Sequence, residues 1–334
     1  MVLVTGATGI LGRVIVLELL KRGKSVRATK RPSSNIDEVR KSYRFYTDRS
    51  EEFFNKIEWV DVDFEDIDSL QIALNQVTEV YHCAGKVSFH PDDRLTMYHT
   101  NIDGTRNLLF ACDNSSVQKF CFVSSTAVLD GVDEKGEVTE DSNYNPKFSH
   151  SSYSKSKHFS EMEVWRASAE GLNTIIINPG VIIGSGNWQS SSGEMFEAFE
   201  KYPYAMSGST AYVDVRDVAE IAISLMEKNI FGERYILISG NKKILEVANF
   251  VREKLGKSEA KVLSKGILKL GYFVNVLFGW LFPKLRIMNR VNLETVTSQQ
   301  TVSNEKIRKE LDYQFIPVLE SIDFHLKNYI SDKK

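Results

Sequence analysis

The glycine-rich segment TGATGILG, residues 5–12, constrains the fold of this chain more than any other feature. It directly follows an apolar run with the composition of a β-strand and leads into a stretch with helical spacing of apolar residues. Gly6, Gly9 and Gly12 permit a tight turn and a close approach of the backbone to a phosphate. A helix that starts at such a turn adds free N–H groups and a partial positive charge. The segment therefore predicts a strand–turn–helix unit that holds the pyrophosphate of a dinucleotide.

Short β-rich runs alternate with helical patterns through the first half of the chain. The expected strands are residues 2–5, 25–29, 57–62, 79–84, 119–124 and 174–179, and the expected helices are residues 10–23, 66–76, 101–114 and a run from about Ser151. Such alternation is typical of a parallel sheet with helices on both faces. Right-handed crossovers then give a doubly wound α/β domain, the Rossmann fold.

The pattern changes after Pro179. Gly, Ser and aromatic residues dominate residues 184–210, and the remainder is mostly helical apart from the strand-like run RYILIS at 234–239. We therefore expect a dinucleotide-binding domain of residues 1–180, to which residues 211–240 return. A smaller, mostly helical substrate lobe is expected from residues 181–210 and 241–334.

The charge balance and the cysteines limit the class of protein. Lys and Arg number 42 and Asp and Glu 44, so the net charge of −2 gives no general attraction to nucleic acid or to an anionic membrane. Cys83, Cys112 and Cys121 are odd in number and lie in apolar runs, which fits a reducing cytoplasm better than a disulfide framework. No basic and apolar leader opens the sequence, and no histidine spacing resembles a zinc site. We expect a cytoplasmic protein with a small-molecule substrate and no metal.

The longest apolar stretch is LGYFVNVLFGWLF, from Leu270 to Phe282. It is too short to span a bilayer. Such a stretch must be covered by the rest of the lobe, by a second subunit, or by a membrane surface or apolar substrate. We expect residues 265–282 to form a helix at the wall or lid of the substrate pocket, with burial in the lobe as the simplest alternative.

The end of the second strand carries Lys30 and Arg31, with no acidic residue until Asp37. Dinucleotides with a free ribose 2′-hydroxyl usually meet Asp or Glu in this region. Two cations favour a 2′-phosphate, so NADP(H) is the expected cofactor and NAD(H) the alternative. An ordinary solvated basic loop would look the same.

Further polar segments follow the expected strands. VSSTAV (123–128) and NPGVIIG (178–184) end two strands at the edge of the sheet where open α/β folds bind ligands. NIDGT places Asn101 near the start of the preceding helix, and YSKSK opens a later one. Tyr153 and Lys157 are four residues apart, so on a helix they share one face.

In their order along residues 1 to about 220, these motifs resemble the extended short-chain dehydrogenases/reductases, also called the NAD-dependent epimerase/dehydratase family. The similarity is greatest to the branch of dihydroflavonol reductases and 3β-hydroxysteroid dehydrogenases. The matching motifs are TGATGILG, DVDF, YHCAG, NIDGT, VSSTAV, YSKSK, NPGVIIG and YVDVRDVA, with a weaker match at SNEKIRKELDY. They are specific to the family and poorly specific to any substrate.

The resemblance implies a catalytic set. Tyr153 is its acid/base, and Lys157 lowers the pKa of Tyr153 and hydrogen-bonds the nicotinamide ribose. By its spacing to Gly131, Thr126 is the hydroxyl that holds the substrate oxygen, with Ser125 as the alternative. Asn101 supports a helix bend and a water path. The implied cofactor-binding residues are Gly6, Thr8, Gly9, Ile10, Leu11, Gly12, Lys30, Arg31, Asp63, Phe64, Ala84, Gly85, Lys86, Ser124, Ser125, Tyr153, Lys157, Pro179, Gly180 and Val181.

Three functions are compatible with these residues. We expect first an NADP(H)-dependent reductase or dehydrogenase for a small, fairly apolar ketone/alcohol pair. A nucleotide-sugar epimerase or dehydratase is disfavoured, because many sugar epimerases have Arg in place of Asn178 and Tyr in place of Asp130. A non-catalytic NADP-binding sensor or scaffold is disfavoured by the intact Tyr153, Lys157 and Thr126. The family also suggests a homodimer through residues 101–114 and 153–169.

Overall fold

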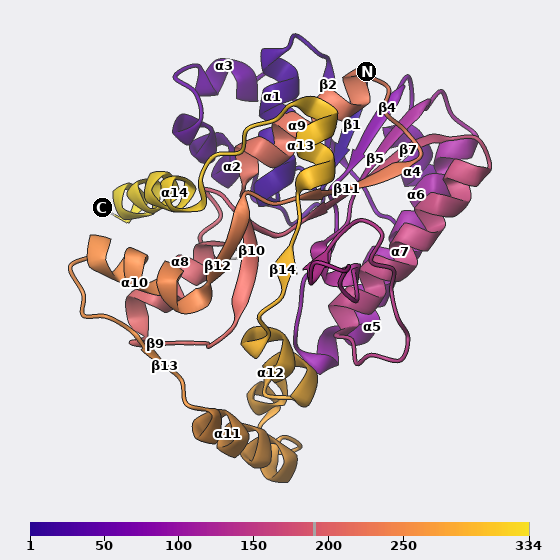
Figure 1. Ribbon diagram of the computed structural model, residues 1–334. Coiled ribbons are helices and arrows are strands. Elements are labelled where there is room, and N and C mark those ends of the chain that lie inside the picture. Colours follow the sequence, from indigo (N-terminus) through magenta and orange to yellow (C-terminus); the bar gives the residue numbers. More distant parts are fainter. Residues whose placement is uncertain (190–191, 334) are drawn as a thin grey trace.

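A seven-stranded parallel sheet forms the centre of the protein, here a computed structural model that describes residues 1–189 and 192–333 (Figure 1). Its strand order is β11-β7-β5-β4-β1-β2-β3. The strands are β1 Val2–Thr5, β2 Val26–Lys30, β3 Glu58–Asp61, β4 Glu79–His82, β5 Lys119–Val123, β7 Asn173–Pro179 and β11 Glu233–Leu237. The expected doubly wound Rossmann fold is thus confirmed, together with a largely helical C-terminal part.

Helices cover both faces of this sheet. On one face lie α1 Ile10–Lys21 and α9 Val215–Glu227, and on the other α4 Ile67–Ala73, α6 Gly104–Asp113 and α7 Ser152–Ala169. The side chains of β1 show the division: Val2 and Val4 pack with α1, whereas Leu3 packs with α6. Burial on both faces explains why the inner strands are continuous apolar runs.

A second layer begins where the chain leaves β7. A three-stranded sheet in the order β12-β10-β8 comprises β8 Val181–Ile183, β10 Ser209–Asp214 and β12 Gly240–Lys243. The helices α8 Ser192–Lys201, α10 Ile244–Lys254 and α14 Val318–Asp332 pack around a separate apolar core beside it. Strand β11 returns to the large sheet, whereas β10 belongs to the small one.

Buried polar contacts join α14 to the rest of the molecule. His325 shares a hydrogen bond of 2.6 Å with Ser185 Oγ and one of 3.2 Å with a carboxylate oxygen of Asp214. All three side chains are fully buried, so this serine–histidine–aspartate cluster has no access to a substrate. Burial lowers the pKa of His325 despite the neighbouring carboxylate. The cluster is a structural joint.

The remaining elements are short. They are α2 Ile36–Ser42, η1 Tyr43–Phe45, α3 Ser50–Phe54, η2 Pro91–Asp93, α5 Arg94–Tyr98, η3 His99–Asp103, η4 Thr126–Val128, β6 Glu137–Val138, β9 Tyr204–Ala205, β13 Lys261–Val262, β14 Thr301–Val302 and α13 Glu305–Leu311. The charge-rich region after β2 is therefore largely helical.

The apolar C-terminal stretch forms α11 Lys265–Phe278, followed by η5 Pro283–Ile287 and α12 Arg290–Thr297. Figure 1 shows α11 and α12 extending away from both sheets. Most large apolar side chains of this stretch are exposed, and Leu268 is the buried exception within α11. Burial of the helix inside the lobe is therefore wrong. Among the described residues, no helix is long and apolar enough to cross a membrane.

Candidate active site

The glycine-rich loop joins β1 to α1 at the carboxyl edge of the large sheet. Gly6 has φ +63°, in the left-handed region that favours glycine. A Cβ on Gly6 would lie 2.7 Å from Ala84 N, and one on Gly12 would lie 2.3 Å from Gly6 O. No side chain caps the first turn of α1, which begins directly after Gly9. This cradle fits a dinucleotide pyrophosphate, since the backbone is bare and the N–H groups at the helix start are uncapped.

Other predicted residues of the loop differ in burial. Thr8 is half-buried, whereas Ile10 and Leu11 are buried in the apolar core. Only the main-chain groups of Ile10 and Leu11 can therefore face a ligand.

Sequence reasoning missed Arg13, which holds this loop from behind. Its side chain is 1% exposed. The guanidinium donates to Thr8 O at 2.5 Å, to Gly9 O at 3.2 Å and to Gly186 O at 2.8 Å, and it pairs with Glu38 at 2.8 Å. Arg13 thereby ties the loop to the segment after β8. A charged residue within an otherwise apolar helical run was the available signal.

The two cations after β2 have different surroundings. Lys30 Nζ lies 2.6 Å from a carboxylate oxygen of Asp61 on β3. Arg31 is exposed, and within the described residues its guanidinium has no ion pair. Its main-chain N–H donates to Ser34 Oγ at 3.1 Å, which shapes the turn. Arg31 is thus the cation that remains available for an anionic ligand.

Asp63 and Phe64 follow β3 farther along the same edge. Asp63 is exposed, and its carboxylate accepts a hydrogen bond from the main-chain N–H of Glu65 at 3.0 Å. The Phe64 ring is half-buried, with its centroid 5.7 Å from that of His82. Burial lowers the pKa of His82 to about 3, so this histidine is neutral and supports the loop after β4.

Tyr153 and Lys157 lie on the first turns of α7. Lys157 Nζ donates to Val123 O at 2.7 Å and lies 4.9 Å from the centroid of the Phe122 ring. Burial lowers the pKa of Lys157 to about 8. Burial also raises the pKa of Tyr153, and a hydrogen bond with Ser125 opposes that rise. The chain by itself therefore favours the protonated phenol, opposite to the lowered pKa that the resemblance implies.

A π-helical segment, η3, contains Asn101. The side-chain amide of Asn101 accepts from Lys86 N at 2.7 Å and donates to Lys86 O at 3.0 Å and to Ser156 Oγ at 2.9 Å. A Cβ on Gly85 would lie 3.3 Å from Lys157 Nζ and 3.4 Å from Asn101 Oδ1. Asn101 therefore fixes the loop after β4 directly beside the lysine.

The VSSTAV segment ends β5 close to the tyrosine. Ser124 is buried, Ser125 lies beside Tyr153, and Thr126 begins η4 immediately beyond. Ser154 Oγ on α7 donates to Ala127 O at 2.7 Å, which locks the helix to this segment. The structure thus brings both hydroxyl candidates to the same end of α7.

A buried polar group lies behind these residues and was not foreseen. Asn178 Nδ2 donates to Ser125 O at 3.1 Å and to Glu161 Oε1 at 2.7 Å. Glu161 lies one turn beyond Lys157 on α7, and its burial raises its pKa. A glutamate four residues after the lysine is a weak signal in sequence, because most such residues face solvent.

Pro179, Gly180 and Val181 form the step from β7 to β8. Gly180 N donates to Leu237 O at 3.1 Å, and a Cβ on Gly180 would lie 2.5 Å from Ala211 O. The chain therefore crosses between the two sheets at a point that tolerates no side chain.

These placements divide the predicted residues into two groups. Four segments lie at the carboxyl ends of neighbouring strands of the sheet: the glycine loop, Ala84 to Lys86, Ser124 to Thr126, and Pro179 to Val181. Helix α7 brings Tyr153 and Lys157 to these segments. Lys30, Arg31, Asp63 and Phe64 lie beyond, at the ends of β2 and β3. The two groups lie along one edge of the large sheet.

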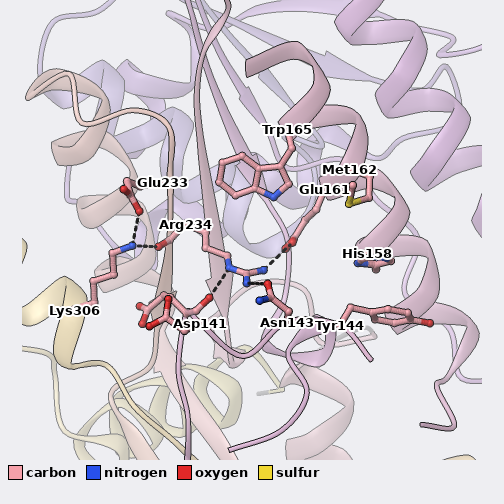
Figure 2. A pocket seen from close by; sticks show the side chains of 11 residues that line it. Asp141, Asn143, Tyr144, His158, Glu161, Met162, Trp165, Glu233, Arg234 and Lys306 are labelled. Carbon is pink, nitrogen blue, oxygen red and sulfur yellow. Dashed lines mark hydrogen bonds and ion pairs between the residues drawn. The ribbon is translucent and has the colours of Figure 1, made fainter. Parts of the chain in front are cut away.

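A cavity of about 390 Å³ lies elsewhere, between α7, β11 and the chain around β6 (Figure 2). Arg234 points into its centre, where it donates to Asn143 Oδ1 at 2.9 Å and lies 3.6 Å from a carboxylate oxygen of Glu161. Lys306 pairs with Glu233 at 2.7 Å. Arg234 and Lys306 are thus already partnered, and Glu161, which also accepts from Asn178, connects this cavity to the candidate site.

Comparison with protein families decides what this arrangement belongs to. The model of the NAD dependent epimerase/dehydratase family matches residues 2–237. The chain belongs to this family. Membership confirms the resemblance drawn from the motifs and makes the protein an NAD(P)-dependent enzyme of the extended short-chain dehydrogenase/reductase type.

Similar members of the family include oxidoreductases. Sterol demethylase protein B of Methylococcus capsulatus (strain ATCC 33009 / NCIMB 11132 / Bath) is 29% identical over 262 residues, covering 76% of this chain and 74% of that protein. Dihydroflavonol 4-reductase of Arabidopsis thaliana is 26% identical over 268 residues, covering 76% and 69%. The crystal structure of gox2253 aligns with a TM-score of 0.82 at 27% identity, covering 99% of this chain and 98% of that one.

Proposed function

We propose that the protein is an NADP(H)-dependent reductase or dehydrogenase for a small, fairly apolar ketone/alcohol pair. One observation carries the proposal: Tyr153 lies beside Ser125 and one helical turn from the buried Lys157, at the sheet edge that holds the glycine loop. An acid/base beside a bare phosphate cradle is the arrangement that proton transfer coupled to a nicotinamide requires.

The residues divide the work as follows. A nicotinamide bound at this edge supplies or accepts the hydride and, when oxidised, adds a positive charge. Tyr153 Oη gives a proton to the substrate oxygen or takes it back. Thr126, or Ser125 as the alternative, holds that oxygen, and Lys157 adds the ammonium charge that favours the phenolate. Asn101 keeps Gly85 and Lys86 in place beside the lysine.

The preference for NADP(H) depends on Arg31. Lys30 is neutralised by Asp61, whereas Arg31 is exposed and unpaired among the described residues. A guanidinium is well suited to a phosphate, because its fork of N–H donors matches two phosphate oxygens. The proposal therefore assigns the 2′-phosphate to Arg31.

The surroundings of Tyr153, and the hydrogen bonds of Asn178 and Asp130, support an apolar ketone or alcohol as the substrate. The Phe89 ring lies 6.1 Å from the ring of Tyr153, so an apolar surface borders the acid/base. Asn178 is engaged by Glu161 and Ser125 O, and the Asp130 carboxylate accepts from Asn145 N at 2.7 Å. Neither residue offers a free cation or phenol to a nucleotide sugar.

Nicotinamide absorbance tests the proposal directly. We expect purified protein, NADPH and a panel of apolar carbonyls to show net loss of reduced nicotinamide, with the reverse change for NADP⁺ and alcohols. Isomerised or dehydrated nucleotide sugar without net cofactor change would support the epimerase or dehydratase instead. Tight NADPH binding without turnover of any substrate would favour the sensor or scaffold.

A further inference from the structure

The segment formed by α11 and η5, residues 265–287, has an unusual surface. Exposed apolar side chains run along α11 and continue past its end, and the largest of them are among the most exposed in the molecule. They are Ile267, Leu270, Tyr272, Phe273, Val276, Leu277, Phe278, Trp280, Leu281 and Phe282. Trp280 is 74% exposed and Phe273 57%. Apolar patches of this extent on a folded protein usually mark a docking surface.

The charges of this segment are of one sign. Between residues 265 and 290 the sequence contains Lys and Arg but no Asp or Glu, although the whole chain has a net charge of −2. Lys269 and Lys284 are exposed and have no ion pair among the described residues. Arg286 is held by Asp92 at 2.7 Å. These two free cations therefore lie on either side of the longest apolar run, Leu270 to Phe282.

We propose that α11 and η5 dock the protein onto the surface of an anionic lipid bilayer. Aromatic and aliphatic side chains between lysines are the pattern of a helix that lies in the headgroup region. At 14 residues, α11 is about 21 Å long and lies well short of the roughly 30 Å hydrocarbon core. It therefore lies on the membrane and does not span it.

A second copy of the chain fits this surface less well. Two α11 segments pressed together would bring Lys269 and Lys284 of both copies to one interface that has no acidic partner within 265–290. Like charges in an interface oppose association. Anionic headgroups, in contrast, satisfy the lysines while the acyl region receives the apolar side chains.

The proposed surface is continuous with the candidate active site. Pro283 O shares a hydrogen bond of 2.8 Å with His90 Nε2, and Asn292 Nδ2 donates to Phe89 O at 2.8 Å. Phe89 in turn borders Tyr153. A docked protein would thus hold Phe89 and the neighbouring Tyr153 near the bilayer. The benefit of this position for an apolar substrate rests on the proposed function, whereas docking itself does not.

Vesicle flotation of the full chain tests the proposal without cofactor or substrate. Binding to phosphatidylcholine vesicles that contain phosphatidylglycerol should be about tenfold stronger than to phosphatidylcholine alone and should weaken in high salt. Phe273→Asp should weaken it about tenfold or more, because a carboxylate replaces an inserted ring. Ile72→Asp is the matched control, since Ile72 is 68% exposed on α4, and it should change nothing.

Two further variants sharpen the result. Lys269→Glu combined with Lys284→Glu should remove the preference for anionic vesicles, whereas Lys41→Glu, at an exposed position on α2, should keep it. Trp280→Ser serves if Phe273→Asp fails to fold. Trp280 fluorescence, taken as the difference between wild type and Trp280→Phe, should shift to the blue with anionic vesicles.

Three outcomes would overturn the proposal. They are absence of vesicle binding, equal losses in the Ile72 control, and a soluble dimer that Phe273→Asp dissociates in the absence of lipid. Vesicle binding by a protein that turns over no carbonyl would leave the docking surface standing and count against the proposed function alone.

Discussion

Tyr153 and Lys157 lie one turn apart, and burial moves both groups toward their neutral forms. The pKa of the tyrosine rises and that of the lysine falls to about 8. Val123 O, which accepts from Lys157 Nζ, holds the ammonium, while Ser125 opposes the rise at the phenol. Further positive charge beside the phenol would lower the pKa of Tyr153 and favour the phenolate.

Replacing Tyr153 by Phe removes the exchangeable proton and keeps the ring. We expect turnover to fall about 10²-fold or more, the scale of a lost general acid, with NADPH binding retained. Steady-state rates and fluorescence titration of NADPH measure the two effects. Near-wild-type turnover would refute the assignment of Tyr153.

Ser125→Ala and Thr126→Ala separate the two hydroxyl candidates. Loss of Ser125 removes a hydrogen bond that lowers the pKa of Tyr153, so the pH profile of turnover should move to higher pH. Loss of Thr126 should lower turnover about tenfold or more without moving the profile. A pH shift in the Thr126 variant alone would reverse the two roles.

Arg31→Ala tests the reading of the 2′-phosphate. The Kd of NADPH should rise about tenfold or more, as expected for a lost charge-assisted hydrogen bond, while that of NADH stays nearly unchanged. Lys30→Ala is the control, because Lys30 is already paired with Asp61. Equal weakening of both cofactors by Arg31→Ala would show that this arginine does not distinguish them.

Among the secondary-structure elements, the sequence predicts best those that a local pattern of apolar residues determines. The strands of the large sheet fall where apolar runs place them, because burial on both faces leaves an unbroken signal such as Val2–Thr5. The π-helical segment η3 at Asn101 has no such signal in the sequence, because contacts with Lys86 and Ser156 stabilise it. Arg13 was missed because its partners are distant backbone carbonyls.

For α11, the sequence predicts the secondary structure but not the surroundings of the helix. Its composition predicts a helix, and a helix forms. Composition does not determine what covers an apolar face, and the alternative of burial within the lobe is contradicted by exposures such as 57% at Phe273. Phe89 lies beside Tyr153, and Asn292 of the C-terminal segment donates a hydrogen bond to Phe89 O, so the role of this segment as a wall or lid stays a prediction.

The helices α6 and α7 carry the expected homodimer interface. Phe110 on α6 is 54% exposed and Phe159 on α7 47%. We predict that Phe110→Asp together with Phe159→Asp converts a dimer to a monomer, because two buried carboxylates would lack partners. Sedimentation equilibrium measures the mass, with Ile72→Asp as the control. A wild-type monomer at all concentrations would contradict the prediction.

For the whole molecule, the question is how the C-terminal part is joined to the large sheet. The division into residues 1–180 with 211–240 and a lobe of 181–210 with 241–334 stays a prediction. The chain between α13 and α14 is anchored by Asp217 on α9, whose carboxylate accepts from Tyr313 Oη and from Ile316 N, each at 2.9 Å. This contact fixes the approach to α14, and through His325 the path to β10.

The contact of Asp217 with Tyr313 and Ile316 should make the stability of the protein sensitive to pH. Burial raises the pKa of Asp217 from 3.8 to about 7. Between about pH 4 and pH 7, therefore, the Asp217 carboxyl is protonated in the folded state and ionised in the unfolded state. The contribution of Asp217 to stability is therefore present below about pH 4 and is lost as the pH rises to about 7. The loss should be on the order of a few kcal/mol at most.

Asp217→Asn keeps a neutral group of the same shape, so urea unfolding should give similar free energies for both proteins at pH 4. At pH 8 the variant should be the more stable of the two. A constant difference across this range would mean that the carboxylate is ionised in the folded protein, held by Tyr313 and Ile316.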